Sequence, residues 1–573
     1  MFGSLKRPPA RLGPWTDRQR PRCGWWSRVV RHPLAPRLMA VLATAVVAAA
    51  IAFFAGPPIG FRVGETAPHD LRVRVRFEVV NFPQTELARE EFGKGNQSLV
   101  VEKYPAGFPI VKAGHPITDG QLELLRYENR AYRAALTRGD RVRRAAALLV
   151  VSLLLTFVMV LYVARFQRGL ADNFIRVVGM CTLALVTLGI GVLLSRSPWF
   201  ALLIPMTLTA MVLTIVYNPP FALLMSFSLA LMASLALGAG LGHFMVQMGA
   251  LAPVVLLLRN VRSRTGLVKV AAGAGIACVL MTVATGVLGG QTPAFVAADA
   301  GRHLLWCLLA GFLLCGGLPA VERTFGVITD VSLVELANSA HPLLQELIRR
   351  APGTYTHSMT VAALAESAAE AIGANVLLAR VGSYFHDVGK MLKPHYFIEN
   401  QTGPNAHDDL EPALSTLVII GHVKDGVALA EQYRLPRPVA DLIRQHHGTT
   451  LVEYFYREVL RLYEGASPPG LEASFRYPGP KPQSREAGIL MLADAVESSS
   501  RALSGPTPAS LIKLVHDLLM KRLLDGQFEE SGLTLTELHR IEESLTKSLI
   551  ALFHARIKYP DADDGEPPVA IAS

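Results

Sequence analysis

Long uncharged runs of apolar residues fill much of the chain before residue 322. The first, LMAVLATAVVAAAIAFFAG at 38–56, is long enough to cross roughly 30 Å of hydrocarbon as a helix. Seven further runs follow, at 145–164, 174–194, 199–217, 221–240, 242–258, 267–289 and 302–321. The pattern predicts eight membrane spans, a single one followed by seven. Only glycines at 238–242 separate the fifth run from the sixth, so seven spans are the alternative.

Basic residues between the runs indicate the side of the membrane on which each loop lies. Cytoplasmic loops carry an excess of Lys and Arg, and an even number of spans puts both chain ends on one side. With the N-terminus inside, the inner loops hold six basic residues, namely Arg165, Arg168, Arg259, Arg262, Arg264 and Lys269. The outer loops hold little beyond Arg196 and the border residue Arg302. We therefore expect an integral inner-membrane protein whose N-terminus and C-terminal domain are cytoplasmic.

Two hydrophilic regions flank the seven later runs. In the first, LRVRVRFEVV at 71–80 alternates polar and apolar residues and predicts a strand, and 117–136 predicts a helix with a capping box of Thr118 and Gln121. This region is therefore expected to be a small extracytoplasmic α+β unit. The second, 324–560, has helical periodicity and the length of one soluble domain.

The predicted fold class is α-helical, with a polytopic membrane region, an all-α cytoplasmic domain and a small α+β extracytoplasmic segment. The predicted domains are a basic cytoplasmic tail at 1–37, a first transmembrane helix at 38–56, a short extracytoplasmic domain at 57–143, a seven-transmembrane region at 144–321, a signalling linker at 322–347, the cytoplasmic domain at 348–560 and a disordered tail at 561–573.

Composition and charge agree with a membrane protein. The chain is 51% hydrophobic and 18% charged, which is too apolar for an ordinary soluble protein. Its net charge is +10, but residues 1–37 alone hold nine basic side chains against the single acid Asp17. The basicity is thus local, so we expect membrane lipid and no DNA or RNA as partners. Four of the five cysteines lie in apolar runs, which leaves no disulfide framework or Cys-based metal site.

Histidines gather in the cytoplasmic domain, where eight of the sixteen lie between His341 and His447. His357 is expected near the start of an amphipathic helix that Gly373 ends, and His386-Asp387 at the end of the next helix, with Gly389 as its terminator. The chain spells His-Asp at three other places, 69–70, 407–408 and 516–517. These lack partner histidines at ligand spacing, and the 407–408 pair is expected to be a loop near the substrate or a structural cap.

A two-metal hydrolytic site needs neutral imidazoles and a carboxylate that bridges the two ions. The spacing suggests His357, His386 and Asp494 for one metal and His422, His446 and His447 for the other, with Asp387 shared. Nitrogen and oxygen ligands without thiolates favour two Mn or Fe ions over a closed structural zinc site.

Two basic residues are candidates for binding phosphate. Lys390 follows Asp387 by three residues, and its alternative role is that of a surface lysine near a helix end. Arg501 shares one helix face with Asp494 and Glu497. Glu497 is expected either to pair with Arg501 or to orient a ligating histidine.

The order H…HD…H…HH…D resembles that of the HD-domain metallohydrolases. The strings HPLLQELIRRAPGTYTHSM, YFHDVGKMLKPHYFIENQ, NAHDDLEPALSTLVIIGHVKDG, LPRPVADLIRQHHGTTLVEYFY, LADAVESSSRAL and HARIKYP more specifically resemble the PgpH-like seven-transmembrane HD family. This resemblance implies hydrolysis of cyclic di-AMP to linear pApA by a di-metal HD domain. As a hypothesis, a metal-activated hydroxide attacks the phosphodiester, with Asp387 and Lys390 as the catalytic pair.

Other functions stay open at this point. The HD-GYP proteins act on cyclic di-GMP, but HHGTTLVEYFY here lacks their GYP motif. Another nucleotide phosphohydrolase, or a receptor that binds nucleotide without turnover, are further alternatives. The segment outside the membrane is shorter than is typical of the family, so its role as a sensor is in doubt. A homodimer also stays open.

Overall fold

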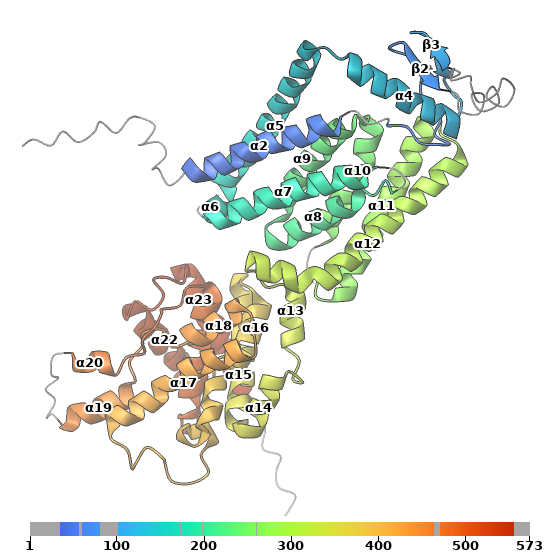
Figure 1. The fold of residues 1–573 in the computed structure, drawn as a ribbon. Helices are drawn as coiled ribbons and strands as arrows, with labels where there is room; N and C mark the ends of the chain where they lie inside the picture. The colour runs from blue at the N-terminus through green and yellow to red at the C-terminus, as the bar shows by residue number, and fades with distance from the viewer. Residues whose placement is uncertain are drawn as a thin grey trace, which may run out of the picture. The chain divides into compact units, whose positions relative to one another are not determined.

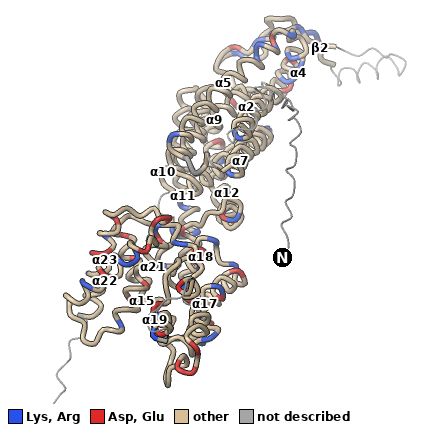
Figure 2. Tube along the Cα trace, turned by 90° about the vertical axis from the view of Figure 1, so that its left-hand side faces the viewer, with Lys and Arg blue, Asp and Glu red and all other residues tan. Residues whose placement is uncertain are grey.

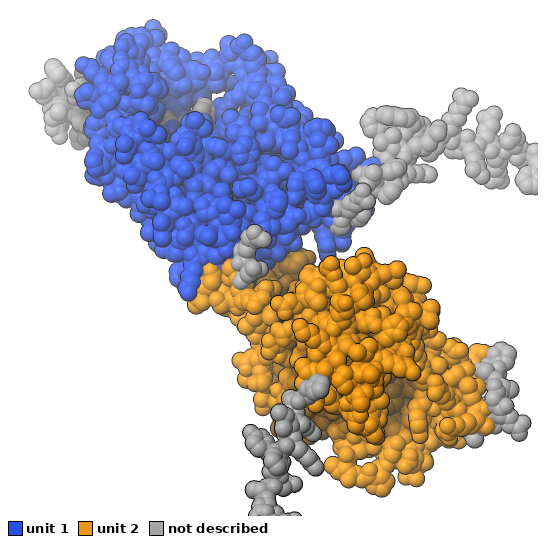
Figure 3. All heavy atoms as spheres, turned by 180° about the vertical axis from the view of Figure 1, so that it is seen from behind, with its two compact units in different colours: residues 1–259, 267–318 blue, residues 260–266, 319–573 orange. Residues whose placement is uncertain are grey.

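The computed structural model describes residues 35–56, 60–80, 101–171, 173–196, 199–258, 261–462 and 470–554. Three segments discussed above lie outside these ranges. They are the predicted disordered tail, the string HARIKYP apart from its first residue, and nearly all of the basic tail. The chain divides into two compact units (Figure 3). Unit 1 comprises residues 1–259 and 267–318, and unit 2 comprises 260–266 and 319–573.

Apolar helices occupy every predicted span in unit 1 (Figure 1). They are α2 (Ala35–Ala55), α5 (Arg138–Phe166), α7 (Phe174–Leu194), α8 (Leu203–Val216), α9 (Pro219–Leu237), α10 (Leu241–Leu257), α11 (Arg264–Leu288) and α12 (Pro293–Phe325), with the short α6 (Arg168–Ala171) after α5. Charged residues are sparse along them (Figure 2). Six are long and apolar enough to cross a membrane, whereas α8 and α10 are shorter.

The break between the fifth and sixth predicted spans lies at the glycines. Gly238 adopts a left-handed conformation (φ 61) directly after α9, and Gly240 precedes α10 in an extended one. A left-handed residue costs little when it is glycine, and it ends a helix. The segment 221–258 is therefore two helices in the structure.

The hydrophilic region between α2 and α5 is a small α+β unit, as predicted. Its strands form two antiparallel pairs, β1 (Leu71–Arg72) with β4 (Pro109–Val111) and β2 (Phe77–Val80) with β3 (Val101–Tyr104). Helix α4 (Asp119–Ala135) begins with the predicted capping box.

The single strand predicted at 71–80 is wrong. The chain leaves the strand between β1 and β2, where the backbone N–H of Arg74 donates to the carboxylate of Glu128 on α4 (3.0 Å). The Arg74 guanidinium also contacts that carboxylate (2.7 Å) and lies over the Tyr132 ring. Because Glu128 is buried, it needs these donors, and the strand is interrupted to supply them.

A buried ion pair fixes the segment after α2 to α12. Arg62 contacts Asp299 through both guanidinium nitrogens, one at 2.8 Å, and the side chains are only 13% and 9% exposed. The guanidinium lies over the rings of Phe200 and Phe295. The helix α12 begins nine residues before the predicted span, which is why Asp299 is helical.

We predict that Asp299→Asn destabilises unit 1 by about 3 kcal/mol, because it leaves a buried guanidinium without its counter-ion. Thermal unfolding of the full chain in detergent measures the effect as a lower midpoint. Glu78→Gln is the matched control, because the Glu78–Lys103 pair is long (3.9 Å) and exposed. Equal midpoints for the two variants would contradict a stabilising role of the buried pair.

Unit 2 is helical throughout its described core. Its α-helices are α13 (Asp330–Leu336), α14 (Pro342–Arg350), α15 (Pro352–Ile372), α16 (Val376–Phe385), α17 (Pro412–Gln432), α18 (Arg437–Gln445), α19 (Glu453–Leu462), α20 (Leu471–Ser474), α21 (Arg485–Arg501), α22 (Pro508–Leu524) and α23 (Leu535–His554). Three 3₁₀ turns join α16 to α17, η1 (Val388–Leu392), η2 (Pro394–Tyr396) and η3 (Ile398–Asn400). Helix α15 packs against α16, α21 and α23. The predicted α-helical fold class, with its small α+β segment, is thus confirmed, and the side of the membrane on which each part lies stays a prediction.

Helix α17 is apolar and long enough to cross a membrane. It nevertheless packs against η1, α18 and α19 and carries the buried His422. We therefore assign it to the all-α domain.

The predicted linker contains α13, whose buried face packs on the helix that leads to the candidate site. Leu333 is fully buried in a cluster that includes Phe385, the last residue of α16. On the other face, Glu335 forms two hydrogen bonds with Arg264, at 2.6 and 3.0 Å.

Candidate metal centre

Five helices bring all seven predicted metal ligands together in unit 2. His357 lies in the second turn of α15, which Gly373 ends in a left-handed conformation as predicted. The other six lie in or next to four further helices. His386 caps the end of α16, and Asp387 comes next. His422 lies within α17, His446 caps the end of α18 and is followed by His447, and Asp494 lies in α21.

The Asp387 carboxylate lies between two sets of histidines. Its Oδ2 atom is 3.4 Å from Nε2 of His357 and 3.2 Å from Nε2 of His386. Its Oδ1 atom is 3.2 Å from Nε2 of His422 and 3.5 Å from Nε2 of His446. Each oxygen therefore faces a different pair of imidazoles, which is the arrangement that a bridging ligand requires.

The candidate ligand atoms form two groups. In each group, all of the ligand atoms lie within 4.8 Å of one another. One group contains His357, His386, Asp387 and Asp494, and the other contains Asp387, His422, His446 and His447. These are the sets that the sequence suggested. Their role as metal ligands stays a prediction.

Backbone carbonyls select the tautomer of three of these histidines. The Nδ1 atoms of His386, His422 and His446 each lie 2.6–2.8 Å from the carbonyl oxygen three residues earlier. Because a carbonyl oxygen only accepts, Nδ1 is the donor, so the neutral form of each imidazole has its lone pair on Nε2, which faces the centre. His357 is held in the same way by Glu497, whose Oε2 accepts from Nδ1 at 2.6 Å.

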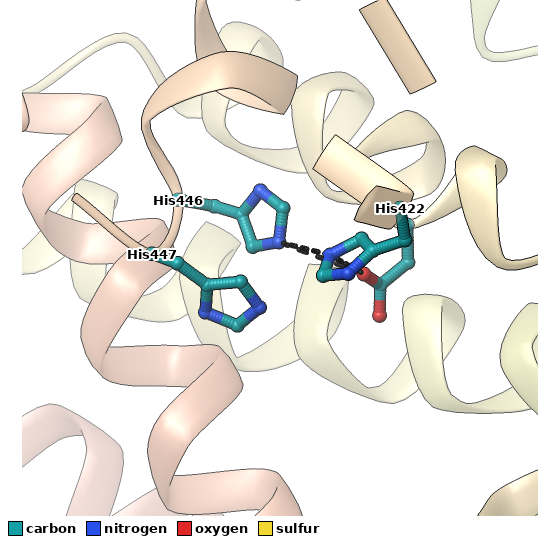
Figure 4. A group of neighbouring side chains, drawn as sticks. His422, His446 and His447 are labelled. Atoms are coloured by element: carbon teal, nitrogen blue, oxygen red, sulfur yellow. Dashed lines mark hydrogen bonds and ion pairs between the residues drawn. The ribbon is translucent and has the colours of Figure 1, made fainter. Parts of the chain in front are cut away.

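Several buried polar atoms at the centre have no hydrogen-bond partner. They are Nε2 of His357, Nε2 of His386 and both carboxylate oxygens of Asp387. Nε2 of His422 and Nε2 of His446 face each other at 3.2 Å (Figure 4), although each carries a lone pair. Buried acceptors are costly unless they are satisfied, and cations satisfy all of these atoms at once. The residues therefore fit divalent metal ions.

The electrostatics of the site favour positive charge at its centre. Burial disfavours a charged His386, but the carboxylates of Asp387 and Asp494 outweigh burial and raise its pKa to about 9. Burial also opposes the charged form of Asp494, yet the neighbouring imidazoles of His357 and His386 hold its pKa well below the usual range. By contrast, burial and the adjacent His446 hold the pKa of His447 well below its usual value. Metal binding displaces such protons from ligands.

Lys390 lies inside the site and is not a surface lysine. Its Nζ atom is 2.7 Å from Oδ2 of Asp387 and 3.1 Å from Oε1 of Glu399, and its side chain is only 14% exposed. Burial opposes its charge, but the two carboxylates raise its pKa above the usual value. Thr354 also donates to Glu399 (3.0 Å). Glu399 was not predicted, because it follows Lys390 by nine residues across two further 3₁₀ turns and no helical spacing links them.

Glu497 plays both of its predicted roles. Besides accepting from His357, it accepts from Nε of Arg501 at 2.7 Å. Arg501 is almost half exposed and lies at the end of α21. Its binding of substrate stays a prediction.

Gly389 was predicted to end α16, and this is wrong. The helix ends four residues earlier, and the chain continues as η1. A Cβ atom at Gly389 would lie 1.9 Å from the carbonyl oxygen of His422 and 2.6 Å from the backbone nitrogen of Gly426. Glycine is therefore needed for the close approach of η1 to α17, which brings His422 to Asp387.

The other His-Asp pairs lie apart from the metal ligands. His407 is buried, bonds to the Tyr396 carbonyl oxygen (2.9 Å) and packs on Phe455, which agrees with the structural alternative. His516 pairs with Glu542 at the surface, and Asp70 accepts from the backbone of Ala113.

Two family models match the chain in the order of its two units. Residues 142–329 match the model described as 7TM receptor with intracellular HD hydrolase, and residues 354–499 match the HD domain. All seven candidate ligands fall within the second match. The site thus belongs to an HD domain.

Curated relatives extend this likeness to most of the chain. The cyclic-di-AMP phosphodiesterase PgpH of Bacillus subtilis (strain 168) is 39% identical over 63% of this chain and 51% of its own length. PgpH of Listeria monocytogenes serotype 1/2a (strain 10403S) is 33% identical over 85% of this chain and 68% of its own length. This chain thus spans between half and about two thirds of these relatives. It belongs to the PgpH-like family of seven-transmembrane HD proteins, and it is an integral membrane protein.

A solved structure is similar in sequence to part of the chain. The crystal structure of the L. monocytogenes PgpH HD domain in complex with cyclic di-AMP is 44% identical, with 38% of this chain and 100% of that chain covered and a TM-score of 0.36.

We predict that Gly389→Ala lowers the metal content of the purified full chain to about half or less, because the new methyl group forces α17 and His422 away from Asp387. Elemental analysis of protein loaded with excess Mn measures this. Gly421→Ala is the matched control, since that glycine lies beside His422 on α17 with nothing within 4 Å of its Cβ position. Full metal content in Gly389→Ala would show that the close approach is not required.

Proposed function

We propose that the chain hydrolyses cyclic di-AMP to linear pApA at its HD domain, with two divalent metal ions held by the seven ligands. The observation that carries the proposal is the Asp387 carboxylate, which faces a complete ligand set on either side. Two relatives with at least 33% identity are named cyclic-di-AMP phosphodiesterases, which supports the substrate.

Different residues of the chain would bind the metals and the phosphates in such a reaction. When bound, the metal ions supply Lewis-acid activation of water and of the phosphate. His386, His422 and His446 present neutral Nε2 atoms, and Asp387 sets the spacing between the two sets. Lys390, beside Asp387, is placed to bind a nonbridging phosphate oxygen and to stabilise developing charge. Arg501 offers a second, partly exposed cation to the other phosphate.

We further propose that the metals are Mn or Fe, because the donor set contains only nitrogen and oxygen. The proposed topology has eight spans with the N-terminus and the HD domain in the cytoplasm, in agreement with the basic loops. The domain boundaries given from the sequence, the lack of a nucleic-acid partner and a homodimer stay predictions of the same kind.

The decisive experiment compares substrates on the full chain. Anaerobically purified protein loaded with Mn or Fe should convert cyclic di-AMP to pApA in preference to cyclic di-GMP and deoxynucleoside triphosphates. Asp387→Asn should lose at least about 100-fold in kcat, because it weakens both metal positions. Asp517→Asn, in the exposed His-Asp pair on α22, is the matched control. Preference for another nucleotide would overturn the substrate, and absent turnover with metal bound would favour the nucleotide receptor.

We predict that Glu399→Gln lowers kcat roughly tenfold without loss of metal, because Lys390 loses one of the two carboxylates that position it. Steady-state kinetics with elemental analysis of the same sample measures both quantities. Glu411→Gln, at the exposed start of α17, is the control. If metal content falls together with kcat, Glu399 supports the ligands and not Lys390.

A further inference from the structure

An apolar cavity lies within the membrane region, far along the chain from the HD domain. A cavity of about 290 Å³ lies among α2, α5, α7 and α9, which pack side by side (Figure 1). Its size is at the lower end of the range for small-molecule sites. Helix α2, the first predicted span, forms one wall of it.

The walls offer almost no polar atoms to an occupant. Four Ser and Thr residues line the cavity, one of them Thr156. The other three donate to backbone carbonyls, Thr44 to Ala40 (2.8 Å), Ser152 to Ala45 (2.8 Å) and Ser228 to Leu224 (2.9 Å). The other lining residues are mainly Ala, Val, Leu and Met. Since polar groups are costly to bury without partners, the occupant of this space must be apolar.

The cavity has the length of one leaflet of a bilayer. Its lining comes from residues 37–48 of α2, 152–164 of α5 and 177–188 of α7. Along α2 this distance is about 16 Å at 1.5 Å per residue, which is roughly half of a 30 Å hydrocarbon core. The cavity therefore begins at the end of the bundle where α2 and α7 start and α5 finishes, and it stops near the middle of the helices.

Positive charge surrounds the open end of the cavity. Arg37 in the first turn of α2 lines it, Arg165 lies in the last turn of α5, and Arg176 lies in the first turn of α7. The opposite end of α5 holds Asp140 together with Arg138, Arg141, Arg143 and Arg144, so basic residues lie at both ends of the bundle, and Arg37 is the basic residue that lines the cavity. An occupant with an apolar tail and an anionic head would match both parts of the site.

We propose that this cavity binds one acyl chain of an anionic phospholipid, with the lipid phosphate at Arg37, Arg165 and Arg176. Under the proposed topology this lipid belongs to the inner leaflet. Because α2 supplies a wall, the bound chain fills the contact between the first span and α5, α7 and α9. The proposal concerns the membrane region alone and does not depend on the chemistry of the HD domain.

Lipid retention by the full chain tests the proposal directly. Protein delipidated in detergent is mixed with equal amounts of phosphatidylglycerol and phosphatidylcholine, and bound lipid is counted by native mass spectrometry. We expect one phosphatidylglycerol to be retained. Arg37→Gln should reduce its preference over phosphatidylcholine about fivefold, because one cation near a lipid head contributes about 1 kcal/mol.

Filling the cavity supplies the second arm. Ala184→Phe, on the α7 wall, should lower retention of either lipid about tenfold or more, since it displaces several methylene groups. Ala43→Phe is the matched control, because Ala43 is exposed on α2 and does not line the cavity. Equal retention by the two variants would overturn the site. Equal retention of both lipids, unchanged in Arg37→Gln, would overturn the anionic class.

A third measurement needs no variant and stays decisive if Ala184→Phe fails to fold. Phosphatidylglycerol with a photoreactive diazirine in its tail is added to the unaltered chain, irradiated, and the labelled peptides are sequenced. Labels on lining residues such as Val41, Ala48 and Ala184 support the proposal. Labels confined to exposed residues that do not line the cavity, such as Met39 and Ile175, would overturn it.

Discussion

The arrangement of unit 2 depends on one carboxylate that must face two sets of imidazoles. The two oxygens of Asp387 can do so only if α15 and α16 approach from one side while α17 and α18 approach from the other. Helices α16 and α18 end at this point, α15 begins close to it, and α17 passes it at its middle. The same need to bring α17 close to Asp387 requires glycine at position 389, because a methyl group there would collide with the backbone of α17. The close packing of η1 on α17 is therefore also what places His422 beside Asp387.

Most of the candidate metal centre could be predicted from the sequence because its residues lie in helices with clear periodicity or directly after them. His357 and Asp494 lie within α15 and α21, and His386 caps the end of α16. Glu399 had no such signal, since 3₁₀ turns lack a repeat from which a contact with Lys390 could be inferred. Gly389 was misread because helix ends and close backbone approaches both favour glycine, and only the fold distinguishes them.

The membrane region shows the same limit in another form. Hydropathy located the eight apolar helices described in unit 1, because an apolar run of sufficient length has few alternatives to a helix in lipid. It did not reveal the pair of Arg62 and Asp299, which lie 237 residues apart. Likewise, alternation predicted one strand at 71–80, but the buried carboxylate of Glu128 competes for its backbone. In both cases, a polar contact between residues far apart in the sequence determines the local structure, and the local sequence pattern does not show it.

The packing of α13 has a mechanical consequence for the metal centre. Leu333 is fully buried against the core that contains Phe385, and Phe385 is bonded directly to His386. A turn of α13 about its own axis would move Leu333 out of this core, and close-packed side chains cannot absorb that without shifting Phe385. Arg264, at the start of α11, bonds to Glu335 on the other face of α13, so this short helix is held on both faces. The orientation of α13 and the position of the backbone that carries His386 are therefore set by the same packing.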